Sequence, residues 1–233
     1  MRAAAAALRR VVAAAFPQDC VVCGAPSGDE PVCGGCRSEL PRLAESCPRC
    51  AMPSPAGQVC GACVRDAPHF DRTIALWRYA PNADRLVHAY KYGGRLALAG
   101  FFARELARRI DPLPAVDAIV PMPLARGRLA ERGFNQAHEV AKRIGRMVRV
   151  PVTARAVRRV RETADQTGLD PGERRRNVRG AFASDAALAG RRVAVVDDVM
   201  TTGASLDELA RVLKRAGATS VENWVIARTL PDA

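Results

Sequence analysis

The chain has 233 residues, 48% of them hydrophobic, which is enough to bury one medium-sized domain and a small module. Lys and Arg outnumber Asp and Glu by 36 to 24, and the net charge of +12 favours nucleic acid or phosphorylated small molecules, unless it only solvates the surface. Aromatic residues at 5% argue against a surface built on base stacking, and the apolar runs are too short for a transmembrane helix.

Residues 1–19 are rich in alanine and predict an N-terminal helix that ends near Pro17. Arg9 and Arg10 interrupt its apolar run, which leaves it too short for the core of a signal peptide. We therefore expect a cytoplasmic location. A membrane-surface helix is the weaker alternative, because the apolar face would be mostly alanine.

Residues 20–68 contain all eight cysteines, arranged as four C-x-x-C pairs with nine residues between the pairs of each half. The cysteines are Cys20, Cys23, Cys33, Cys36, Cys47, Cys50, Cys60 and Cys63. Four thiolates complete a tetrahedral structural zinc site, so the repeated spacing predicts a double zinc ribbon. Disulfides of a secreted protein would use the same residues, but the missing export signal favours metal.

The simplest connectivity of this module is sequential, with the first four cysteines on one ion and the last four on another. An interleaved arrangement stays open, as does loss of metal affinity by one half. Few apolar residues lie between the cysteines, so zinc should supply most of the folding free energy of the module. Scaffolding, nucleic-acid contact and partner binding are all compatible with it.

Residues 69–150 read as the first part of an α/β domain that extends to residue 233. A strand is expected at 70–79, helices at 83–92 and 95–110, and a short strand at 117–120. Residues 121–136 then form a loop before an amphipathic helix that ends near Met147. Arg126, Arg128 and Arg132 crowd this strand end, which is where ligands of open α/β sheets bind.

The most informative stretch is 193–205, which has four apolar residues, Asp197 and Asp198, and then the turn 201–205 before a helix up to Gly217. The apolar run predicts a strand buried on both faces. The turn contains Thr201, Thr202, Gly203, Ala204 and Ser205, where the unpaired N–H groups of a helix start favour an anion. Two carboxylates would repel a phosphate, so they should face hydroxyl groups or a cation. A phosphate beside two hydroxyls describes a ribose 5-phosphate.

Other readings of this stretch are less specific. The chain has no P-loop motif and no dinucleotide-binding glycine fingerprint. A plain strand-to-helix junction, with Thr201 or Thr202 as the N-cap, remains the structural alternative.

This segment resembles the phosphoribosyl pyrophosphate motif of the type I phosphoribosyltransferases over thirteen residues, with Ser205 in place of the usual Thr. The resemblance implies that Asp197 and Asp198 bind the ribose 2- and 3-hydroxyls and that residues 201–205 wrap the 5-phosphate. It also implies a pyrophosphate loop after the preceding strand, with candidates Pro121, Met122, Pro123, Arg126, Arg128 and Arg132. A flexible hood over the pyrophosphate would include Arg161, Thr163, Gln166 and Arg174.

The sequences Pro-Met-Pro-Leu at 121–124 and Arg-Gly-Phe-Asn-Gln at 132–136 narrow the resemblance to the ComF/GntX family of competence and DNA-utilisation proteins. That family joins a double zinc ribbon to a phosphoribosyltransferase-like domain. The implied architecture is a zinc-ribbon module at 20–68 and a parallel-sheet α/β domain at 69–233. Residues 155–160 are expected to add a strand and residues 220–227 another.

The resemblance implies a protein that binds phosphoribosyl pyrophosphate with Mg²⁺, a phosphoribosyltransferase if it is active, in DNA uptake or utilisation during natural competence. The alternative is a non-enzymatic single-stranded-DNA-binding protein whose pocket only binds or senses a ligand, and which meets DNA-uptake proteins. Arg174, Arg175 and Arg176 would then contact the DNA backbone, if they are not simply solvated. The sequence identifies no acceptor base, general base or oligomeric state.

Overall fold

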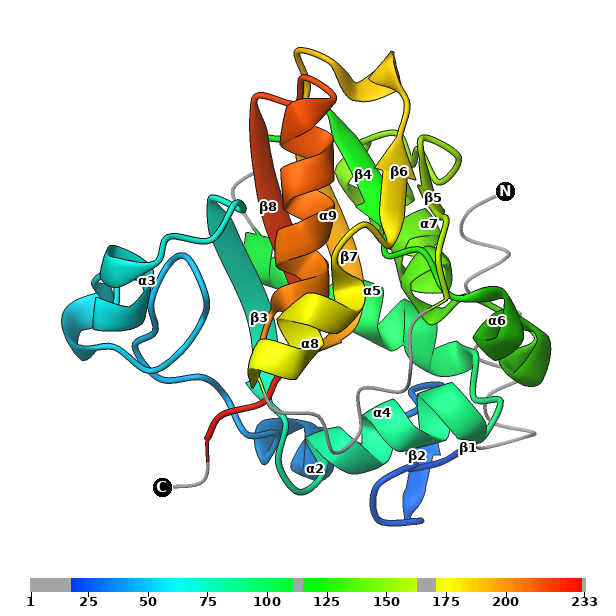
Figure 1. The fold of residues 1–233 in the computed structure, drawn as a ribbon. Coiled ribbons are helices and arrows are strands. Elements are labelled where there is room, and N and C mark those ends of the chain that lie inside the picture. The colour runs from blue at the N-terminus through cyan, green and yellow to red at the C-terminus, as the bar shows by residue number, and fades with distance from the viewer. Residues whose placement is uncertain (1–17, 111–114, 163–170, 232–233) are drawn as a thin grey trace.

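The computed structural model describes residues 18–110, 115–162 and 171–231 (Figure 1). The N-terminal helix expected before Pro17, and the hood candidates Thr163 and Gln166, lie outside these ranges.

The domain is built on a four-stranded parallel sheet with the strand order β3-β8-β7-β4. The strands are β3 (Arg72–Arg78), β4 (Ala118–Pro121), β7 (Arg192–Met200) and β8 (Ser220–Arg228). The predicted parallel α/β fold is therefore confirmed. β7 continues four residues beyond the expected apolar run and carries both aspartates, because its pairing with β8 extends to Met200 opposite Arg228.

Helices cover both faces of this sheet (Figure 1). Three of them, α4 (Ala83–Tyr92), α5 (Ala97–Ile110) and α7 (Gln136–Val148), pack on one face, and α9 (Ala204–Arg215) packs on the other with α8 (Pro171–Val178) beside it. β7 serves both layers, since Val193 and Val195 pack toward α9 while Ala194 and Val196 pack toward α5 and α7. All four residues are fully buried, as predicted for a strand covered on both faces.

Two segments differ from the expected local structure. The strand expected at 155–160 is β5 (Val157–Arg159), which pairs antiparallel with β6 (Phe182–Ser184) outside the main sheet. The 3-10 helix η2 (Ala186–Leu188) follows β6. Residues expected as loop contain the short helix α6 (Arg126–Arg132), which ends at Gly133 in the left-handed conformation. Its residues are mostly good helix formers, and a glycine terminates such a helix without strain.

The cysteine-rich segment lies along the outer edge of β3. It consists of β1 (Gln18–Asp19), β2 (Pro26–Gly28), α2 (Gly34–Ser38), the 3-10 helix η1 (Pro55–Gly57) and α3 (Gly61–Arg65). The carbonyls of Pro41 and Pro48 accept hydrogen bonds from the N–H groups of Arg78 and Thr73. The segment thereby covers an edge strand whose polar groups would otherwise stay unpaired. Within the described ranges, no helix is long and apolar enough to cross a bilayer.

Candidate functional site

A cavity of about 450 Å³ opens at the carboxyl ends of β4 and β7. The sequence-predicted residues that line it are Met122, Pro123, Arg128, Arg132, Arg174, Asp197, Asp198, Thr201 and Ser205. Residues from four separate parts of the chain therefore meet at one place, on the side of the sheet where open α/β folds bind ligands.

The two carboxylates at the end of β7 lie in different surroundings. Asp198 forms an ion pair with Lys91 of α4, with 3.0 Å between Oδ1 and Nζ, and both side chains are mostly buried. Asp197 accepts the N–H of Asp198 at 2.9 Å. Burial and the neighbouring charge of Asp198 raise the pKa of Asp197 to about 7, while Lys91 and Arg159 oppose the shift. Asp198 is therefore paired with a cation, whereas the surroundings of Asp197 work against its ionisation.

The turn between β7 and α9 presents backbone rather than side-chain donors. Gly203 is the N-cap of α9, with a φ of 84° and no capping side chain, so neither Thr201 nor Thr202 fills that position. Thr202 instead accepts the N–H of Ala204 at 3.3 Å. A Cβ at Gly203 would lie 2.7 Å from Cε of Met200. The positive φ favours glycine here, a Cβ would also have to displace the end of the Met200 side chain, and the helix start remains open toward an anion.

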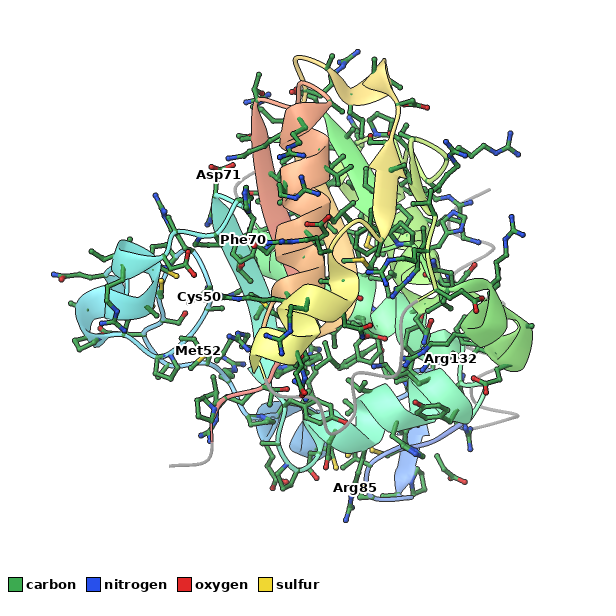
Figure 2. All side chains as sticks on the ribbon, viewed as in Figure 1. Cys50, Met52, Phe70, Asp71, Arg85 and Arg132 are labelled. Atoms are coloured by element: carbon green, nitrogen blue, oxygen red, sulfur yellow. The ribbon has the colours of Figure 1, made fainter. Side chains whose placement is uncertain are left out.

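Arginine side chains also line the cavity. The guanidinium of Arg132 lies 5.0 Å from the ring centre of Tyr92, and its Nη2 donates to the Tyr92 hydroxyl at 3.1 Å. Arg159 of β5 stacks over Phe182 at 5.5 Å, and burial lowers the pKa of its guanidinium. Aromatic contacts hold these two cations in place, as suits a fixed phosphate-binding wall. Figure 2 shows Arg132 on α6, at the far side of the molecule from Cys50.

Several predicted site residues do not line the cavity. Pro121 is buried within β4, and Arg126 is exposed at the start of α6. Arg161 donates to the carbonyls of Asn177 and Arg179 at 2.7 Å each, so it fastens the end of α8 to β5. Thr202, Gly203 and Ala204 are not among the residues that line the cavity.

The residues that line the cavity but were not selected by the sequence analysis include Lys91, Gln136 and Arg159. Gln136 begins α7 and is only 2% exposed, and its Nε2 has no hydrogen-bond partner among the described residues. A buried amide donor without a partner is costly unless a ligand or water completes it. The sequence indicated that a basic residue near Lys91 could reach a phosphate. The ion pair of Lys91 with Asp198 depends on tertiary contacts, which the sequence does not show.

The eight cysteines form two separate clusters in sequential order. Cys20, Cys23, Cys33 and Cys36 form the first, Cys47, Cys50, Cys60 and Cys63 the second, and within each the sulfurs lie within 4.8 Å of one another. The separations of 3.8 Å for Cys23–Cys33 and 3.6 Å for Cys50–Cys60 match the roughly 3.8 Å expected between thiolates on a tetrahedral zinc ion. The predicted sequential grouping is therefore the one that the structure has.

Backbone donors favour the thiolate form in both clusters. The N–H groups of Cys33 and Cys60 point at the sulfurs of Cys20 and Cys47. Although burial opposes it, these donors lower the pKa of Cys20 to about 6 and that of Cys47 to about 7. Both donor sets fit structural zinc.

Comparison with known proteins agrees with this arrangement. Residues 11–64 match the double zinc ribbon domain, and residues 129–230 match the phosphoribosyl transferase domain. The chain is 32% identical over 207 residues to competence protein F of Haemophilus influenzae, covering 85% of each protein. It is 36% identical over 169 residues to DNA utilization protein YhgH of Escherichia coli K12, covering 70% of this chain and 74% of that protein.

The fold and the two clusters thus define a double zinc ribbon joined to a phosphoribosyltransferase-type domain. The chain belongs to the ComF family, whose members include competence protein F and the DNA utilization proteins, and the resemblance seen in its sequence is confirmed.

Proposed function

We propose that the cavity binds phosphoribosyl pyrophosphate with Mg²⁺ and that this binding serves DNA uptake or utilisation. The observation that carries the proposal is the meeting of Asp197 and Asp198 with the uncapped start of α9 in one cavity that has an arginine wall. Phosphate, hydroxyl and cation each find a chemically suitable partner there. The names of the relatives supply the biological process.

In this proposal the turn 201–205 and the start of α9 hold the 5-phosphate. Asp197 and Asp198 accept the ribose hydroxyls, and Arg128, Arg132 and Arg174 face the pyrophosphate. Mg²⁺ arrives with the ligand, because carboxylate and phosphate oxygens are the ligands it prefers. The cytoplasm remains the expected location.

If the protein is an enzyme, the reaction is transfer of the phosphoribosyl group. A bond forms between C1 of the ribose and a nucleophilic atom of the acceptor, the bond from C1 to the pyrophosphate oxygen breaks, and the acceptor loses a proton. The contribution of the chain would be to position the ligand and stabilise the departing charge. Its arginine wall and uncapped helix start are suited to both tasks.

Calorimetric titration of the zinc-loaded protein with phosphoribosyl pyrophosphate and Mg²⁺ tests the proposal. Wild type should bind, and Asp198→Asn should lose at least about tenfold in affinity because a hydrogen-bonding carboxylate is removed. Asp29→Asn is the matched control, since Asp29 is exposed in the cysteine-rich segment and should leave binding unchanged. Absence of wild-type binding at millimolar ligand would refute the proposal.

Single-stranded DNA is the second candidate ligand. The relatives are named for competence and DNA utilisation, and Tyr92 is 64% exposed beside Arg132 at the cavity. An exposed aromatic ring next to a cation is a common contact for an unpaired base. Binding to an oligonucleotide that weakens steeply with salt and survives Asp198→Asn would favour this function over the sugar-phosphate site.

A further inference from the structure

Arg228, the last residue of β8, is a buried arginine with unusual partners. Its side chain is 5% exposed, and within the described residues its hydrogen bonds all go to backbone carbonyls. Its Nε donates to Cys50 at 2.9 Å, and its Nη1 donates to Met200 at 3.0 Å, to Thr229 at 2.7 Å and also to Thr201. A buried cation whose partners are all neutral carbonyls needs compensating negative charge nearby.

The second cysteine cluster supplies that charge. The guanidinium of Arg228 donates to the carbonyl of Cys50, which is one of the four cysteines of this cluster. Four thiolates around Zn²⁺ carry a net charge of −2, so the metal-loaded cluster still attracts a guanidinium. Arg228 therefore has an electrostatic reason as well as a hydrogen bond to remain beside this cluster.

Through Arg228 the cluster is joined directly to the candidate phosphate site. The carbonyl of Cys50 belongs to a metal-binding knuckle that is itself fixed to β3, where Pro48 accepts the N–H of Thr73 at 2.9 Å. The carbonyls of Met200 and Thr201 lead into the turn 201–205. Cys50 and Met200 also share one apolar cluster with Phe70. One guanidinium thus connects a knuckle of the second cluster to the start of the strand-to-helix turn.

The first cysteine cluster has no such connection in the part of the chain that the structure describes. Its polar side-chain contacts include α4 and α5, where Arg85 reaches the carbonyl of Val22 at 3.5 Å and Arg37 pairs with Glu105 at 2.7 Å. Figure 2 shows this separation, with Arg85 beside α4 and Cys50 beside β3. The two halves of the double ribbon are alike in sequence but differ in what they support.

We propose that Arg228 is a positioning residue that transmits the order of the second zinc cluster to the turn 201–205. Ligand binding at that turn then depends on the second zinc and not on the first. The identity of the ligand rests on the proposed function, whereas the link between cluster and turn does not.

Amide hydrogen exchange on the zinc-loaded full chain tests the link without any ligand. Arg228→Met should raise exchange in the peptide spanning residues 201–205 by about tenfold or more, because hydrogen bonds to a charged donor are lost. Arg85→Met is the matched control, since it removes an arginine contact to a carbonyl of the first cluster, and it should leave this peptide unchanged. Equal exchange in wild type and Arg228→Met would overturn the proposal. If Arg228→Met does not fold, Arg228→Lys keeps the charge with fewer donors and should give a smaller increase.

Removing one zinc at a time tests the difference between the clusters. Cys33 and Cys60 occupy equivalent positions in their halves and are similarly half-buried. Cys60→Ser should raise exchange at 201–205 and weaken phosphoribosyl pyrophosphate binding about tenfold, whereas Cys33→Ser should change neither. Equal effects of the two variants would refute the proposal. If wild type binds no phosphoribosyl pyrophosphate, the proposed function fails, and the exchange data alone still decide the role of Arg228.

Discussion

At the residue scale, the ionisation of Asp197 depends strongly on its surroundings. Its pKa, ordinarily 3.8, is raised to about 7 by burial and by the charge of Asp198. The folded protein therefore keeps a proton that the unfolded chain has lost. The free energy of unfolding consequently falls as pH rises from about 4 to about 7, because the half-buried group becomes charged in the folded protein beside Asp198.

This shift predicts a pH-dependent effect of Asp197→Asn. At pH 8 the variant should be more stable than wild type, with a melting temperature higher by a few degrees, because it lacks a buried carboxylate. At pH 5 the difference should be smaller, and below about pH 4 it should vanish, since Asp197 is then protonated in both the folded and the unfolded chain. Thermal melts of both proteins across this range check the prediction, with Asp29→Asn as the exposed control. A constant difference at all pH values would contradict it.

The same carboxylate should make ligand binding sensitive to pH in the opposite direction. Ribose hydroxyls and a cation both require the ionised form, so the affinity for phosphoribosyl pyrophosphate should rise as pH increases through 7. The low stability of the ionised apo site is thus consistent with a site arranged for a ligand rather than for its own packing.

The sequence predicted the residues of this site better than their contacts. The adjacent aspartates and the Thr-Thr-Gly turn are contiguous, so their chemistry was visible in one stretch. Lys91 lies more than a hundred positions away from Asp198, and their ion pair exists only because α4 packs on the same side of the sheet. Gln136 was part of a recognised motif, but its burial without a partner is a tertiary property.

At the element scale, the junction of β7 and α9 is set by Gly203. Its positive φ and the 2.7 Å separation that a Cβ would have from Met200 make two independent demands. Met200 also accepts a hydrogen bond from Arg228 and packs with Phe70. A displacement of Met200 would therefore change contacts of the second cysteine cluster as well as those of the turn.

Gly203→Ala should accordingly destabilise the protein by about 2–4 kcal/mol, which combines backbone strain with a steric clash. Gly180→Ala is the matched control, because Gly180 has a φ of 70° but open space around a Cβ. The control should cost only about 1 kcal/mol. Urea unfolding of the two variants measures both terms. Equal losses would show that Met200 yields freely.

The element boundaries show what local sequence leaves undetermined. The apolar run 193–196 predicted the buried centre of β7, but hydrogen bonds to β8 carry the strand on to Met200. Likewise, all three arginines of the expected loop lie in α6, which places Arg128 and Arg132 on the cavity and Arg126 away from it. The pairing of β7 with β8 and the direction of α6 determine which side chains line the cavity.

At the scale of the whole molecule, the cysteine-rich segment is continuous with the core of the α/β domain. Cys20 and Cys36 share an apolar cluster with Trp77, Phe101 and Trp224. The second cluster shares another with Phe70, Met200 and Leu206 on the opposite face of the sheet. The sequence predicted the zinc ligands from their spacing, but spacing carries no information about which surfaces the ribbons would cover.

This continuity predicts that loss of zinc weakens the sheet itself. Both tryptophans of the chain lie in the sheet, Trp77 in β3 and Trp224 in β8, and both are buried, so their fluorescence reports the α/β domain. Trp77 also stacks on Phe101 of α5 at 5.8 Å, beside the first cysteine cluster.

Chelation removes the ions that hold both ribbons together and leaves the edge of β3 and two apolar surfaces poorly covered. The melting temperature followed by tryptophan fluorescence should therefore fall by several degrees or more with an excess of chelator, and the same chelator saturated with zinc should have no effect. An unchanged tryptophan transition, together with confirmed release of two zinc ions per chain, would mean that the ribbons fold apart from the sheet and add nothing to its stability.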